Sequence, residues 1–281
     1  MQPLSHNIED YPQGIILPID KPYRWTSADV IRKVKYMAIK HFGKKNLKVG
    51  HAGTLDPLAT GILLVCIGAA TKKAEELQRS AKQYVAGVTF GATTPSYDLE
   101  KEIDREFPLD GVSAETVRNI LPQFIGEQDQ VAPLFSAKSV DGVRAYETAR
   151  KLFKAGLPLD DTGILQANRI TIYDLNLDEY LTPGTCTAEG TTPDNKQVPG
   201  ESNSNDRNNR IHVADISGYS LPTAMIRVDC SKGTYIRSLA RDLGEALGSG
   251  AFLSSLRRTK NGGFTIEDAI TMDQLQDFFR P

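Results

Sequence analysis

The sequence predicts an α+β fold, and three observations support this prediction. Segments 14–22 and 62–68 are short and apolar, and segment 225–231 alternates apolar and polar residues, as strands do. Apolar residues also recur at helical spacing after Ser27 and after Ser113. With 281 residues, 40% of them hydrophobic, the chain is long enough to bury a full core. These patterns do not define the order of the strands.

Composition argues against several classes of protein. An odd number of cysteines without C-x-x-C spacing is not a disulfide framework, and the scattered histidines indicate no metal site. The first thirteen residues lack a basic-then-apolar leader pattern, and no apolar run approaches the ~18 residues of a membrane span. We therefore expect a cytoplasmic protein without a metal or a membrane partner. The cysteines and histidines are Cys66, Cys186, Cys230, His6, His41, His51 and His212.

Local charge differs from the net charge of −2, which by itself argues against a nucleic-acid-binding domain. Between Lys21 and Lys48 there are nine cations and one acid, Asp29. A second basic group lies within segment 227–260. If the two groups share a face, they form a surface that can follow phosphates. The alternative is two ordinary solvated faces.

The first elements are predicted to be a strand and a helix. Segment 14–22 reads as a short buried strand that stops at Pro22, and Thr26 or Ser27 then caps a helix. The apolar face of this helix consists of Val30, Ile31, Val34 and Ala38.

Segment 50–61 is a loop rich in glycine and proline that displays one acid. Gly53 and Gly61 permit tight backbone geometry, and Pro57 favours an extended conformation for Asp56. The residues leave open an ordinary turn in which the Asp56 side chain caps the backbone.

As a whole string this loop closely resembles the TruB family of tRNA pseudouridine synthases, whose signature is G-H-x-G-x-L-D-P-x-A-x-G. The resemblance implies that Asp56 is the catalytic nucleophile and that His51 helps to fill the space vacated by the target base. The alternative for His51 is a turn histidine satisfied by the backbone. The family's D-K-P segment is matched at 20–22, which implies that Lys21 contacts phosphate or the active site; the alternative is a strand-end lysine.

Segment 71–98 carries three further candidates. Lys72 opens a polar helical stretch and is assigned to substrate binding. Tyr84 begins a strand and, from periodicity alone, is a core-facing aromatic; the family's K-x-Y tripeptide implies that it lies against the target base. Asp98 resembles the last Asp of the family's T-D-T-x-D segment, although Pro95 and Tyr97 depart from that pattern.

Ser113 is predicted to cap a helix that ends at Gly126. Segment 133–150 then resembles a family element that closes over the RNA, and we expect a mobile segment at about 130–155. Tyr146 is its candidate RNA contact. Segment 182–210 is polar and is predicted to be a flexible loop.

Segment 230–244 strongly resembles the family's second signature. After the turn at Lys232, a helix is predicted that carries Arg237 in its first turn and ends at Gly248. In the family this arginine pairs with the nucleophilic Asp; the alternative is an exposed helix arginine. Lys232 is assigned to substrate binding, and segment 252–264 matches the family's L-x-x-L-R-R-T-x-x-G-x-F pattern.

The resemblance covers nearly the whole chain and implies the pseudouridine synthase fold: a mixed, largely antiparallel sheet with flanking helices and a central RNA-binding cleft. We expect residues 1–281 to form a single catalytic domain without a C-terminal PUA domain. The implied function is isomerisation of uridine 55 in the T-loop of tRNA, without a cofactor, by a monomer that needs no protein partner. The implied catalytic residues are Asp56, Tyr84 and Arg237. The alternatives are a non-catalytic RNA chaperone on the same scaffold and a subunit that acts on guide-RNA-selected sites.

Overall fold

The structure is a computed structural model, and it describes residues 4–136, 139–140, 143–145, 149, 151–152, 167–182 and 211–280. The chain divides into two compact units, here called unit 1 (1–84 and 256–281) and unit 2 (85–255). The chain passes between the units within β4 (Lys82–Phe90) and β12 (Ala251–Asn261). No helix in the described part of the chain is long and apolar enough to span a membrane.

Unit 1 is built around the buried strand β3. β1 and β2 pair with β3 in antiparallel fashion, whereas β12 pairs with it in parallel fashion. The strands are β1 (Ile15–Lys21), β2 (Val49–Ala52), β3 (Ala59–Ile67) and β13 (Phe264–Thr265), with the adjoining parts of β4 and β12. The helices are η1 (Ile8–Asp10), α1 (Ser27–Phe42), η2 (Gly68–Lys73), α2 (Ala74–Arg79), η5 (Ile266–Asp268) and α6 (Gln274–Phe278).

Helix α1 begins where its sequence predicts. The Thr26 side chain accepts a hydrogen bond from the Asp29 amide at 3.1 Å, and the Asp29 carboxylate accepts one from the Thr26 amide at 3.0 Å. This capping box satisfies backbone donors that have no partner within the helix. The helix ends before Gly43, whose φ of 62° lies in the left-handed region.

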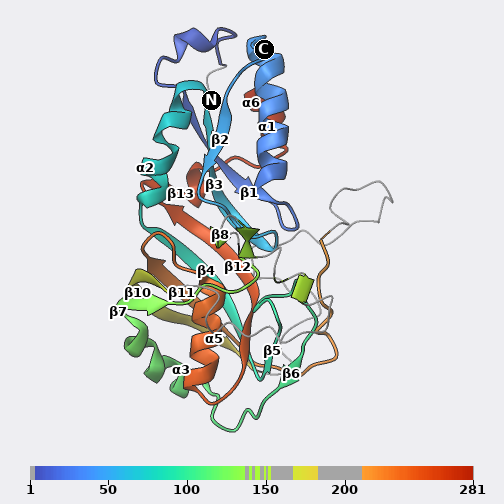
Figure 1. The fold of residues 1–281 in the computed structure, drawn as a ribbon, viewed down its shortest axis with the longest axis vertical. Helices are drawn as coiled ribbons and strands as arrows, with labels where there is room; N and C mark the ends of the chain where they lie inside the picture. Colours follow the sequence, from blue (N-terminus) through green and yellow to red (C-terminus); the bar gives the residue numbers. More distant parts are fainter. Residues whose placement is uncertain are drawn as a thin grey trace. The chain divides into compact units, whose positions relative to one another are not determined.

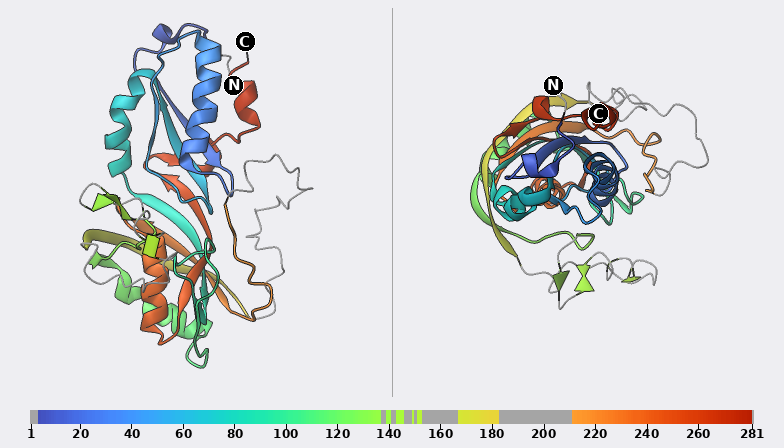
Figure 2. Two further views of the ribbon diagram at one scale, coloured as in Figure 1. Left: turned by 45° about the vertical axis from the view of Figure 1, so that its right-hand side comes forward. Right: turned by 90° about the horizontal axis from the view of Figure 1, so that it is seen from above.

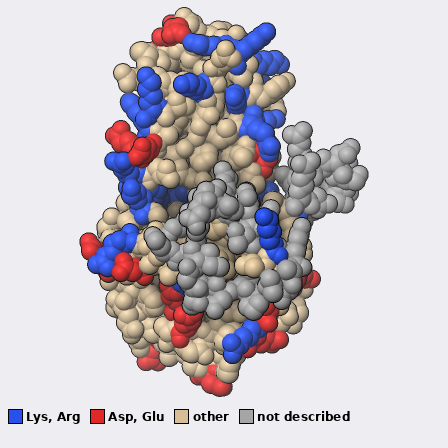
Figure 3. Space-filling view, in the orientation of Figure 1, with Lys and Arg blue, Asp and Glu red and all other residues tan. Residues whose placement is uncertain are grey.

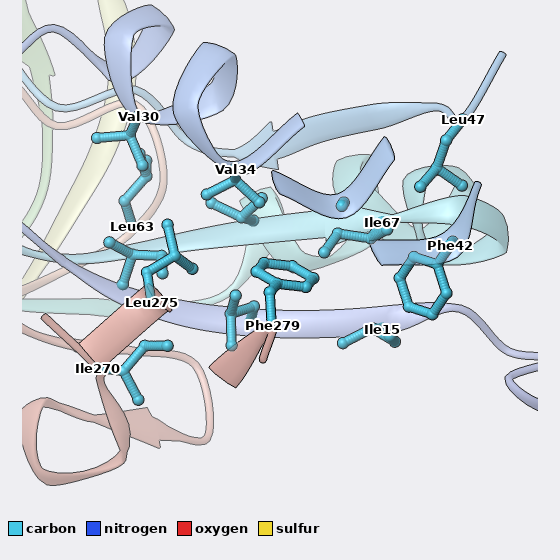
Figure 4. Packing of buried hydrophobic residues seen from close by; sticks show 14 of the residues in the cluster. Ile15, Val30, Val34, Phe42, Leu47, Leu63, Ile67, Ile270, Leu275 and Phe279 are labelled. Atoms are coloured by element: carbon cyan, nitrogen blue, oxygen red, sulfur yellow. The ribbon is translucent and has the colours of Figure 1, made fainter. Parts of the chain in front are cut away.

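The two faces of β3 bury different helices, because successive strand residues point to opposite sides. Leu63, Val65 and Ile67 belong to one buried cluster with residues of α1 and α6. Figure 4 shows Leu63 and Ile67 in this cluster. Ile62 and Leu64 form a second cluster with Leu77 of α2. Figures 1 and 2 accordingly show α1 and α6 on one side of the unit 1 strands and α2 on the other. The result is a sheet covered on both faces, and β3 is buried throughout.

Unit 2 contains a second group of antiparallel strands, in which β10 pairs with β11 on one side and with β7 on the other. The strands are β5 (Ala92–Thr93), β6 (Arg105–Glu106), β7 (Gly126–Gln130), β8 (Ser139–Val140), β9 (Val143–Arg144), β10 (Asn168–Leu181) and β11 (Thr223–Cys230). The helices are α3 (Ala114–Ile120), η3 (Leu121–Phe124) and α5 (Ile236–Ala246), and Figure 1 shows α3 and α5 beside these strands.

The structure confirms the α+β class and the mixed, mostly antiparallel sheet. Ser113 caps α3, and the predicted strand and helix of the second signature are β11 and α5. Most of the polar segment 182–210 lies outside the described residues, and within segment 130–155 the structure describes the short β8–β9 hairpin. The single catalytic domain, the mobile segment and the central cleft remain predictions.

Candidate functional site

The loop that carries Asp56 is anchored by a buried arginine of β12. The Arg258 side chain is 1% exposed. Its guanidinium donates to the carbonyl oxygens of Ile62 at 2.7 Å, Gly53 at 3.1 Å and Thr54 at 3.4 Å. Burial of a charge without hydrogen-bond partners is costly, and here carbonyl dipoles supply the partners. Arg258 therefore fixes the backbone on both sides of Asp56.

Lys21, at the end of β1, is a second anchor of this loop. The side chain is 0% exposed, and its ammonium donates to the carbonyl oxygens of Pro57, Pro22 and Trp25 at 3.1, 3.1 and 2.6 Å. These bonds use the three protons of an ammonium group. Burial lowers the pKa of Lys21 from 10.5 to about 7, and the nearby negative charge of Asp56 acts in the opposite direction.

The resemblance implies that Lys21 contacts phosphate or the active site, and the structure places this residue at the end of β1 against the loop that carries Asp56. Its three partners are carbonyl oxygens of its own unit, two of them within four residues of Lys21. A contact between Lys21 and RNA remains a prediction.

Short-range contacts complete the frame of the loop. The Ser27 hydroxyl accepts from the Leu55 amide at 3.0 Å and donates to the Leu55 carbonyl at 3.1 Å. Gly61 follows the loop with a φ of 94°, and a Cβ atom at this position would lie 2.2 Å from the Arg258 carbonyl oxygen. The Gly61 amide donates at 3.1 Å to Asp20, whose carboxylate also pairs with Arg257 at 2.8 Å. Because the backbones of Gly61 and Arg258 approach so closely, only glycine fits at position 61.

Asp56 itself is partly exposed and lies at the centre of this framework. Its charge acts on Lys21, which means that the two groups are near each other. His51 is also partly exposed, and its pKa is lowered by burial and by the positive charge of Arg258. A lowered pKa leaves the imidazole neutral at pH 7, able to donate through one nitrogen and accept through the other.

Tyr84 and Lys72 occupy different environments in unit 1. Tyr84 is 8% exposed in β4, which confirms the core-facing position that its periodicity predicts. Lys72 is exposed in η2. Contacts of these two side chains with RNA remain predictions.

In unit 2, Arg237 and Asp98 form a buried ion pair. Arg237 Nε lies 3.6 Å from Asp98 Oδ2, and the residues are 4% and 5% exposed. The guanidinium also donates to the carbonyls of Ser96 at 3.2 Å and Phe135 at 3.0 Å. Asp98 accepts from the Ser96 hydroxyl at 2.6 Å and the Glu100 amide at 2.9 Å. The alternative of an exposed helix arginine is therefore wrong, and the pairing of Arg237 with Asp56 that the resemblance implies remains a prediction.

The other candidates of unit 2 are less defined. Lys232 is exposed in the turn before α5, and Tyr146 lies outside the described residues. Within the described part of the chain, no group of three or more His, Cys, Asp or Glu side chains is arranged to hold a metal ion.

Sequence reasoning did not assign the anchoring roles of Arg258, Ser27 and Asp20. The available signal was the family pattern that includes Arg258, but that pattern does not say which backbone groups an arginine will meet. Both interpretations of the basic group within segment 227–260, a surface that follows phosphates or an ordinary solvated face, place its side chains at the surface. That expectation is wrong for Arg237 and Arg258, which are buried.

Comparison with known proteins decides the family. A sequence profile described as "TruB family pseudouridylate synthase (N terminal domain)" matches residues 40–189. A second profile, "tRNA pseudouridylate synthase B C-terminal domain", matches residues 237–280. The chain belongs to the TruB family of pseudouridylate synthases.

Relatives within the TruB family match over nearly their full length. The chain is 41% identical over 269 residues to tRNA pseudouridine synthase B of Phocaeicola vulgatus, covering 96% of this chain and 94% of the relative. It is 41% identical over 270 residues to the protein of that name from Flavobacterium johnsoniae, covering 96% and 97%.

A solved structure agrees with the TruB family fold. The structure of a Cbf5-Nop10-Gar1 complex contains a chain that matches with a TM-score of 0.59 and 25% identity. The match covers 97% of this chain and 56% of the solved one, so this chain spans little more than half of that protein. This likeness supports the fold.

Proposed function

We propose that this TruB family protein converts uridine 55 in the T-loop of tRNA to pseudouridine, with Asp56 as the nucleophile. Near-full-length similarity to proteins named tRNA pseudouridine synthase B supports the reaction and the substrate. The observation that carries the assignment of Asp56 is its loop, which Arg258, Lys21 and Ser27 hold by backbone hydrogen bonds on both sides of the carboxylate. A nucleophile must be held near its attack position, because misplacement by about 1 Å can cost about 10²-fold in rate.

The reaction is an isomerisation that needs no redox change. The bond between C1′ of the ribose and N1 of uracil breaks, the base turns, and C1′ bonds to C5. The proton on C5 leaves and N1 gains one, so the atoms balance. Asp56 assists either by attack on the base or by attack on the sugar, and both routes require its ionised form.

We assign supporting roles to the remaining candidates. Tyr84 contacts the uracil ring, and neutral His51 helps to fill the space left by the flipped base. Arg237, oriented by Asp98, supplies fixed positive charge to the reaction. Contacts with the RNA come from exposed Lys72 and Lys232 and from Tyr146, whereas Lys21 supports the loop.

The same proposal includes the setting of the enzyme. We expect it to act on tRNA in the cytoplasm, as a monomeric catalytic domain without a cofactor. A catalytically silent RNA chaperone has no need of a buried arginine such as Arg258 to immobilise the Asp56 loop, and this observation favours the enzyme. The solved relative is part of a protein complex, and we do not extend that assembly to this chain.

Tritium release tests the proposal. A tRNA transcript labelled at uridine C5 is incubated with the purified protein and with Asp56→Asn, without guide RNA or other proteins. We expect release from wild type, loss of more than about 10³-fold in Asp56→Asn, and wild-type release from the exposed control Asp110→Asn. A transcript with cytidine at position 55 maps the site. Tight tRNA binding without release from wild type would instead support the chaperone.

A further inference from the structure

Resting on the proposed function, we propose that the outward face of α1 binds the sugar-phosphate backbone of tRNA outside the T-loop. This contact is additional to the residues around Asp56. We define the basic face of α1 as the exposed side chains Arg32, Lys33, Lys35, Tyr36 and Lys40, with Lys44, Lys45 and Lys48 following the helix.

The spacing of three of these residues produces one continuous strip. Lys33, Tyr36 and Lys40 are three and four residues apart, so they lie on the side of the helix opposite Val34 and Ala38, which face the core. Tyr36 is 69% exposed, an unusual position for a large aromatic side chain. An exposed aromatic between two cations offers a stacking surface beside charges that attract phosphate.

The positive charge of the face is largely uncompensated. Within the described part of the chain, Arg32 forms an ion pair with Asp29, and Lys44 forms one with Glu9. The other lysines of the basic face form no ion pair with the described residues. They are Lys33, Lys35, Lys40, Lys45 and Lys48. Figure 3 shows basic side chains recurring along the surface where α1 runs in Figure 1. Such a field attracts an anionic polymer and releases its counterions on binding.

The position of α1 fixes which part of an RNA this face can reach. Ser27 ties the start of the helix to Leu55, next to Asp56. A rise of 1.5 Å per residue places the backbone of Lys40 about 20 Å along the helix from Ser27. That length corresponds to roughly six charges along one nucleic-acid strand. With its target base at Asp56, an RNA would therefore meet the far end of α1 through nucleotides several positions away.

A comparison of two RNA substrates tests this contact. Lys33→Gln/Lys40→Gln is assayed by tritium release on full-length tRNA and on a minimal hairpin that keeps the T-loop but only the first two base pairs of its stem. The stem is shortened because nucleotides about six positions from the target base would still be present in an intact T-arm. We expect the kcat/KM ratio of full-length tRNA to hairpin to fall about tenfold at low salt. The slope of log affinity for full-length tRNA against log salt should become shallower by about 1.5, because two phosphate contacts are lost.

Two matched variants exclude trivial causes. Arg105→Gln/Arg118→Gln removes the same charge from exposed positions of unit 2, and we expect it to leave the ratio and the slope unchanged. Lys33→Arg/Lys40→Arg keeps the charge and should retain most of the wild-type preference. Thermal unfolding checks that the helix is intact in every variant.

Equal losses on both RNAs, or wild-type values on both, would overturn the proposal; the second result would leave the basic face to a protein partner. Failure of the proposed function is a different outcome, in which wild type releases tritium from neither RNA.

Discussion

The guanidinium of Arg258 donates to the carbonyl oxygen of Gly53 across 3.1 Å, joining residues 205 positions apart in the chain. The same side chain reaches Ile62 on the other side of Asp56 at 2.7 Å. One buried arginine thereby determines the shape of the loop on which the proposed nucleophile lies. Its backbone also approaches Gly61 so closely that a side chain there would collide with it.

Replacement of Arg258 by lysine should impair catalysis more than substrate binding. Lysine keeps the charge but lacks the planar fork that reaches three carbonyl oxygens. We expect kcat to fall about 10- to 100-fold with a smaller change in KM, measured by tritium release. Arg227→Lys, at an exposed pair with Asp178, serves as the control and should stay close to wild type. A kcat within twofold of wild type would mean that Arg258 does not position the loop.

Gly61→Ala should distort the same loop from the backbone side. Its Cβ atom would lie 2.2 Å from the Arg258 carbonyl oxygen, so the chain must shift. We expect a large loss of activity and destabilisation by about 3 kcal/mol, measured by urea unfolding. Gly43→Ala has a similar positive φ but no atom within 4 Å, and should cost only about 1 kcal/mol. Equal effects at the two positions would argue against the close approach.

Asp98→Asn should destabilise the protein because it leaves the buried Arg237 without its carboxylate. Loss of one partner of a buried pair costs about 3–5 kcal/mol, and we expect the lower end because two carbonyls still accept from Arg237. Asp178→Asn breaks a more exposed pair and should cost less than about 1 kcal/mol. Comparable free energies of unfolding for the two variants would contradict the buried pair.

Lys21 should make stability depend on pH. Its pKa is about 7 in the folded protein and near 10.5 in the unfolded chain, so the unfolded state binds more protons between these values. The free energy of unfolding therefore rises with pH in this window. Relative to Lys21→Met, wild type should gain roughly 2 kcal/mol between pH 7.5 and 9.5.

Urea unfolding of wild type and Lys21→Met at both pH values gives this difference directly. Subtracting the free energy of unfolding of the variant from that of wild type cancels the titration of the other groups. A difference that stays constant with pH would show that Lys21 keeps its ordinary pKa, and hence that burial does not govern its charge.

Local patterns were sufficient for several elements of the fold, but they did not predict β10 and β12, the two longest strands. The apolar run before Pro22 predicted β1, the cap at Thr26 and the helical spacing after it predicted α1, and alternation predicted β4 and β11. The glycine and proline residues around Asp56 predicted its loop. Each of these signals lies within one segment, because backbone propensity and amphipathic spacing act over a few residues.

By itself the sequence therefore determined these few elements, the Asp56 loop and the family resemblance. Only the tertiary structure decided that Lys21 and Arg258 are buried anchors and that Arg237 pairs with Asp98. The physical reason is that a charged side chain is buried only where acceptors from distant segments meet it. Such a meeting depends on how strands far apart in the chain pair, and spacing within a single segment carries no information about it.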